Sequence, residues 1–160
     1  MAGDVALLEH LDAALTSPSL INLNRPRIEA LRADLGDGSV PALFAHPPAR
    51  LQWRLRLETD VELETALGLQ PGAWEHSGDG VVFVVGVRDW LGAHELRRVT
   101  LDPRRTAADR AWRPLSVDLS PWRGRTIRLT LRTEAGERGD AGWDWAVWRA
   151  PTLRRSGGGG

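Results

Sequence analysis

The sequence predicts an all-β protein: an antiparallel β-sandwich with jelly-roll topology and one short N-terminal helix. A run of β-branched and aromatic residues over 81–87 follows a Gly-Asp-Gly turn, which is typical of a strand buried on both faces. Alternating apolar and polar segments recur at short spacing on both sides of it, as in a sandwich. We expect a helix and lead-in at 1–19, the sandwich at 20–155, and a glycine-rich linker or tag at 156–160.

Composition excludes several function classes. The absence of cysteine rules out thiol catalysis, thiolate metal sites and disulfides. All 21 basic residues are arginine, so lysine chemistry is also excluded. The 21 acidic residues bring the formal net charge to zero, which gives no overall attraction to nucleic acid or to an anionic membrane. We therefore expect no nucleic-acid partner, and no membrane insertion because no run approaches ~20 apolar residues.

The first half of the chain begins with apolar residues at helical spacing behind Asp4, which predict a helix over 4–15. This helix has two alternative roles, packing on the sandwich or leading in from a neighbouring domain. Glycines at 36 and 38 predict a turn, and the two prolines at 47 and 48 must end a strand. Strands are expected at 20–24, 27–35 and 40–45.

Two half-buried strands follow at 51–57 and 61–69. Arginines occupy the polar positions of the first and glutamates those of the second, so we expect them to pair across the solvent face. The segment 80–87 is predicted to be an interior strand. The remaining elements are expected to be a hairpin loop at 89–93, a strand at 95–101, a helical turn at 106–110, and strands at 114–119, 125–133 and 146–153.

Several segments together resemble the galactose-binding-like jelly rolls, and in particular carbohydrate-binding modules and the extracytoplasmic appendage domains of bacterial envelope proteins. They are Ala42–Pro48, Gly78–Phe83, Val117–Ser120 and Trp143–Trp148. The resemblance implies a non-catalytic accessory binding domain of a larger envelope or secreted protein, with a glycan as ligand and a periplasmic or cell-surface location. No signal peptide is visible in this chain.

Jelly rolls of this kind often hold one structural calcium ion, and Asp79 and Asp144 are the candidate ligands. Calcium takes about 6–8 oxygen ligands, many of them backbone carbonyls, from loops. The alternative is that Asp79 only shapes its turn and Asp144 only bonds backbone groups.

Two tryptophans are candidates for a ligand platform. Trp90 lies at the predicted hairpin tip, and Trp143 lies in the glycine-rich approach to the last strand. Flat aromatic faces suit stacking on sugar rings, but exposed tryptophans also mark protein interfaces. Glu75 and His76, in the loop before the central strand, complete the candidate ligand set. By contrast, we expect the family-like tryptophans at 74, 112 and 148 to pack in the core.

An enzyme is not expected, because the nucleophile-elbow, dinucleotide and P-loop motifs are all missing. The competing hypothesis to glycan binding is a structural domain. It would dock on its parent protein, or on a second copy of itself, through the face over 5–15 and the exposed tryptophans.

Overall fold

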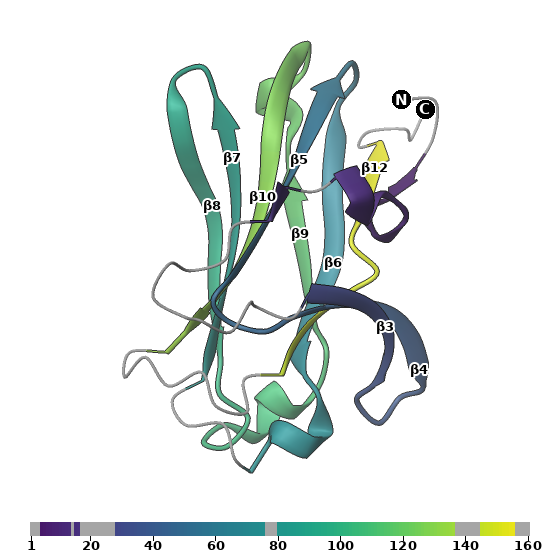
Figure 1. Ribbon diagram of the computed structural model, residues 1–160, viewed down its shortest axis with the longest axis vertical. Coiled ribbons are helices and arrows are strands. Elements are labelled where there is room, and N and C mark those ends of the chain that lie inside the picture. Colours follow the sequence, from purple (N-terminus) through teal and green to yellow (C-terminus); the bar gives the residue numbers. More distant parts are fainter. Residues whose placement is uncertain (1–3, 14, 17–27, 76–79, 137–144, 156–160) are drawn as a thin grey trace.

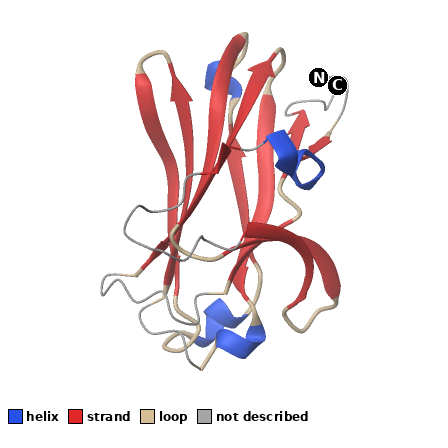
Figure 2. Ribbon diagram, in the orientation of Figure 1, coloured by secondary structure: helices blue, strands red, loops and turns tan. Residues whose placement is uncertain are grey.

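The computed structural model describes residues 4–13, 15–16, 28–75, 80–136 and 145–155, which form two antiparallel sheets packed face to face (Figures 1 and 2). The predicted sandwich is confirmed. One sheet contains β1 (Val5–Ala6), β3 (Ile28–Asp34), β4 (Ser39–Ala45), β6 (Val61–Leu69), β9 (Arg113–Asp118), β11 (Ala146–Arg149) and β12 (Thr152–Arg155). The other has the order β2-β5-β10-β7-β8, with β2 (Leu15–Thr16), β5 (Ala49–Leu57), β10 (Arg125–Ala135), β7 (Val81–Asp89) and β8 (Gly92–Leu101).

β7 is an interior strand, as its composition predicts. It pairs along its whole length with β8 on one side and with β10 on the other. Val84 points away from the sandwich core, yet it is only 1% exposed because neighbouring side chains cover it. On the same outer face Val82 and Gly86 are half-buried and Arg88 is exposed, so the strand is interior in its sheet and fully buried only on its inward face.

The core lies between the two sheets, and its centre is Trp148 of β11. This side chain is fully buried, and its ring meets that of Phe83 edge to face, with the centroids 5.2 Å apart. Such edge-to-face pairs add to the stabilisation that area burial gives. The placement of Trp148 in the core is confirmed, and it joins the two sheets through one aromatic contact.

A second apolar cluster covers the other side of the seven-stranded sheet. Trp74, Trp112 and Trp145 are half-buried there, around buried Phe44 and Val147. The Trp74 indole N–H donates to the Leu69 carbonyl at 2.8 Å. Trp74 and Trp112 are thus packed as expected, but mainly on this outer side.

The N-terminal helix that the sequence indicates is only partly formed. In its place lies the 3₁₀ segment η1 (Leu7–Ala13), which is interrupted at His10, where φ is −120° and ψ is 26°. The two ends of the predicted helix instead form β1, which pairs with β12, and β2, which pairs with β5. A segment this short is below the length at which an α-helix is stable. Leu7 is 1% exposed in the main core, and the His10 carbonyl accepts from the Trp53 indole at 3.1 Å, so the segment packs on the sandwich.

The predicted charge pairing between the strands at 51–57 and 61–69 is wrong. These are β5 and β6, and they belong to different sheets because the chain crosses the sandwich between them. Glu64 instead pairs with Arg154 of β12, at 2.9 Å. The arginines of β5 are left on the outer face of the five-stranded sheet without these glutamates.

The last predicted strand is divided into two. β11 pairs with the C-terminal end of β6 and β12 with its N-terminal end, and the break falls at Ala150, whose φ is +32°. The Thr65 hydroxyl donates to the Arg149 carbonyl at 2.8 Å and so satisfies a group that the break frees. The remaining turns are η2 (Pro71–Ala73), η3 (Ala107–Arg110, as predicted) and η4 (Ser120–Trp122). The strand expected at 20–24 lies outside the described residues.

Candidate binding face

The outer face of the five-stranded sheet contains a groove of about 330 Å³. Its floor is made by small or compact residues of the two central strands, Val84, Gly86 and Thr130. A Cβ on Gly86 would lie 3.1 Å from the His94 carbonyl oxygen, and the β7–β8 ladder is irregular here. Glycine therefore permits both the close approach of β8 and the depth of the groove.

The groove walls carry polar side chains that could donate or accept hydrogen bonds. The Gln52 amide meets the Thr130 hydroxyl at 3.3 Å and lies against Arg50. His94 and Glu95 of β8 line the opposite wall. The walls therefore offer both hydrogen-bond donors and hydrogen-bond acceptors, and a polyhydroxylated ligand requires both.

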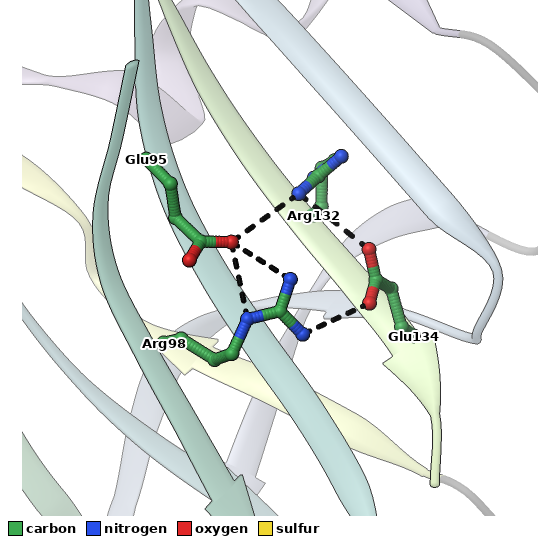
Figure 3. Close-up of polar contacts among 4 residues, drawn as sticks. All are labelled: Glu95, Arg98, Arg132 and Glu134. Carbon is green, nitrogen blue, oxygen red and sulfur yellow. Dashed lines mark hydrogen bonds and ion pairs between the residues drawn. The ribbon is translucent and has the colours of Figure 1, made fainter. Parts of the chain in front are cut away.

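One corner of this face is a closed charge network (Figure 3). Glu95 accepts from Arg98 at 2.7 Å and lies 3.7 Å from Arg132, while Glu134 lies 3.4 Å from Arg98 and 3.5 Å from Arg132. The Arg98 hydrogen bond lowers the pKa of Glu95, and Glu95 in turn raises the pKa of Arg98. Two arginines and two glutamates neutralise each other here.

The neighbouring row of the sheet is different. Arg54 of β5 is the direct partner of Arg128 of β10, which is the direct partner of Arg88 of β7. All three side chains are exposed, and they line an adjoining hollow of about 340 Å³. Within the part of the chain that the structure describes, none of the three makes an ion pair or a side-chain hydrogen bond. We call Arg54, Arg88 and Arg128 the arginine row.

The carboxylate next to the arginine row is that of Asp89, and it forms hydrogen bonds with other groups. The Asp89 side chain is only 4% exposed and accepts hydrogen bonds from the Trp122 indole at 2.9 Å and the Leu91 backbone N–H at 2.8 Å. Its Oδ1 also lies 2.9 Å from Nε2 of His94. These contacts lower the pKa of Asp89 from 3.8 to about 2, and the hydrogen bond from Trp122 has the largest effect. Asp89 thus fixes the β7–β8 hairpin to η4; it lines the same hollow as the arginine row, but its hydrogen bonds go to Trp122, Leu91 and His94 and not to the arginines.

This arrangement predicts an acid-sensitive hairpin. Because the folded state lowers the pKa of Asp89, the stabilisation is complete above about pH 4 and is lost as the pH falls towards 2. We expect Asp89→Asn to flatten the dependence of the free energy of unfolding on pH in this window, as measured by urea unfolding at several pH values. An unchanged pH slope in the variant would show that other carboxylates cause the acid sensitivity.

The structure separates the candidate residues that the sequence suggested. Trp90 is at the β7–β8 hairpin tip and is 79% exposed. Glu75 is exposed and follows directly after η2, and this short helix lies at the end of the sandwich opposite the β7–β8 hairpin (Figure 1). These two residues do not form one site. His76, Asp79, Trp143 and Asp144 lie outside the described residues, so the calcium ligands stay a prediction.

The exposed Trp90 side chain allows a direct test of its role. We expect Trp90→Ala to change the free energy of unfolding by no more than about 0.5 kcal/mol, as an exposed position should. Thermal unfolding followed by circular dichroism measures this change. A loss of several degrees in the melting temperature would place Trp90 in a contact that the hairpin needs.

The arginine row cannot be recognised from the sequence alone. Arg54 is recognisable as a polar position of a half-buried strand, and Arg128 likewise. Their position opposite each other depends on which strands pair, and on the register. The zero net charge conceals this local concentration of positive charge.

The part of the chain that the structure describes lacks two further features. No helix there combines the length and apolar character needed to cross a bilayer. No group of three or more His, Asp or Glu side chains in those residues could hold a metal ion.

Comparison with solved structures defines the fold class. The second CBM51 module of Clostridium perfringens ZmpB, solved in complex with GlcNAc and INT domains, aligns with a TM-score of 0.67 and 16% identity over 95% of this chain and 31% of that one. The CBM51 of Clostridium perfringens GH95, in complex with methyl-galactose, gives 0.63 and 14% over 94% of this chain and 99% of that one. TmCBM61, in complex with β-1,4-galactotriose, gives 0.54 and 14% over 94% of each chain. The chain therefore has the galactose-binding-like jelly-roll fold of carbohydrate-binding modules.

Comparison with known protein sequences gives less information about this chain than comparison with solved structures. No family model matches the chain. An uncharacterized protein of Archaeoglobus fulgidus is 33% identical over an alignment of 118 residues that covers 69% of this chain and 30% of that protein. The chain thus spans under a third of the length of this relative.

Proposed function

We propose that this domain binds a glycan in the groove on the outer face of the five-stranded sheet. The observation that carries the proposal is the groove itself: a hollow of about 330 Å³ on a carbohydrate-binding-module fold, lined by arginine, glutamine, threonine, histidine and glutamate side chains. Sugars present many hydroxyl groups, and planar polar side chains of this kind bond them in pairs. Trp90, at the tip of the β7–β8 hairpin, is an exposed aromatic residue at the same end of the sheet as Arg88, but it lines neither the groove nor the adjoining hollow.

The proposed role is non-catalytic and accessory. The solved structures that share the fold are described as carbohydrate-binding modules, and two of the modules above occur within or beside larger proteins. The domain would then concentrate a parent protein on a glycan-bearing surface in the periplasm or outside the cell. The calcium ion implied by the resemblance would stabilise loops in such a setting.

A glycan array tests the proposal, probed once with calcium and once with a chelator. Ala93 is an exposed residue at the groove rim, and Ala93→Trp should obstruct the groove without changing charge. We expect the wild-type domain to bind at least one class of glycan, and Ala93→Trp to weaken this binding at least about tenfold.

The matched control is Thr100→Trp, an exposed position on the same strand that does not line the groove. It should bind like the wild type. If no glycan is bound under either condition, or if both variants bind equally, glycan binding in this groove is refuted. A concentration-dependent dimer together with an empty array would favour the structural, self-associating alternative.

A further inference from the structure

We propose that the ligand of this face is an acidic polysaccharide, and that Arg54, Arg88 and Arg128 hold its carboxylates. This inference rests on the proposed glycan-binding function and names the class of glycan. The starting observation is the register: the three residues stand opposite one another on adjacent strands β5, β10 and β7. Adjacent strands are about 4.7–4.9 Å apart, so the row crosses about 10 Å of the sheet.

The three positive charges of the arginine row make no ion pair among the described residues. Like charges directly opposite each other on neighbouring strands destabilise a sheet. Further along the same face, Glu95 and Glu134 neutralise Arg98 and Arg132, at distances of 2.7 to 3.7 Å. The arginine row has no such partner among the described residues, and Asp89 is bonded to Trp122 and Leu91 instead. A bound anion would remove a repulsion that the fold leaves in place.

The chemistry of the row favours carboxylates carried on a sugar chain. A guanidinium group presents planar paired donors that match a carboxylate. The groove beside the row adds neutral hydrogen-bonding groups, Gln52 and Thr130, suited to hydroxyls. Proteins that bind single-stranded nucleic acid combine a basic groove with aromatic platforms for the bases. The residues that line the groove and the adjoining hollow include no tryptophan or phenylalanine.

Affinity gel electrophoresis with polygalacturonate tests the inference, with fully methyl-esterified polygalacturonate as the uncharged form of the same polymer. We expect the domain to be retarded by polygalacturonate and at least about tenfold less by the ester. The variant Arg54→Gln/Arg88→Gln/Arg128→Gln should lose at least tenfold in affinity for polygalacturonate. It should fold at least as stably as the wild type, because the repulsion is gone.

The control variant is Arg104→Gln/Arg105→Gln/Arg113→Gln, which removes three exposed arginines that line neither the groove nor the adjoining hollow. Both variants change the net charge from 0 to −3, that is 18 basic against 21 acidic residues. Retention of binding by the control supports the arginine row, whereas an equal loss in both variants refutes it. Equal binding of the acid and its ester refutes the inference but leaves glycan binding intact. Binding to duplex DNA or to phosphatidylserine vesicles as tight as to polygalacturonate also refutes it, as a general attraction to anions.

Discussion

Replacing Trp148 by alanine is expected to lower the free energy of unfolding by about 3–5 kcal/mol, the range typical of a large aromatic side chain removed from a core. The side chain is fully buried, and it contacts Phe83 of the opposite sheet edge to face. The variant would lose the transfer free energy of the indole and leave a cavity between the two sheets. Urea unfolding at constant pH, followed by circular dichroism, measures the change.

Two variants bracket this result. Trp148→Phe keeps an aromatic ring in the core and removes an indole N–H that has no hydrogen-bond partner among the described residues, so it should cost clearly less than alanine. Trp90→Ala removes the same side chain from an exposed position and should cost almost nothing. If Trp90→Ala unfolded the domain while Trp148→Ala did not, the assignment of the core in this half of the sandwich would be wrong.

Replacing Gly80 by alanine is expected to cost about 2–5 kcal/mol, since a side chain at positive φ costs about 1–2 kcal/mol and overpacking adds about 1–3 kcal/mol. Gly80 has φ +86° and leads directly into β7. A Cβ there would lie 2.6 Å from the Leu101 carbonyl oxygen, which is backbone and cannot rotate away. Thermal unfolding provides the measurement.

Gly36→Ala separates the two contributions. Gly36 has φ +112°, but a Cβ would have no atom within 4 Å. It should therefore show only the conformational cost, about 1–2 kcal/mol. Equal destabilisation by the two substitutions would mean that the strand entrance moves to accommodate the methyl group, and that the contact with Leu101 is not rigid.

Most of the strands could be predicted from the sequence, because each is set by its own residues. The continuous apolar run at 81–87 predicts an interior strand buried on both faces; β7 is interior, but its outer face is only partly buried, with Arg88 exposed. The glycine turn at 36–38 and the helical turn near 106–110 also appear where local chemistry places them. Side-chain period and turn residues are local signals, and they give the elements and their inward faces.

Pairing between strands is not local, and this is where prediction from the sequence fails. Alternation shows that Arg54 and Glu64 each face solvent, but not that they face it from opposite sheets. The division of the last strand depends on β6 accepting two partners in succession, which no pattern within 146–153 indicates. Predicting the arginine row requires the registers of two strand pairs, β5 with β10 and β10 with β7. Composition cannot reveal it, since the compensating acidic residues lie elsewhere on the molecule.

The position of β8 has a consequence for how the domain behaves when crowded. It is a ten-residue strand at the edge of its sheet, and an exposed edge of this length is a template for intermolecular β-pairing and aggregation. The irregularity opposite Gly86 twists this edge, and Glu95, Arg97 and Arg98 place charges of both signs along it. An approaching copy would have to bury these charges and match an interrupted ladder. Many such domains could therefore stand side by side, on one surface or in one polypeptide, and remain separate.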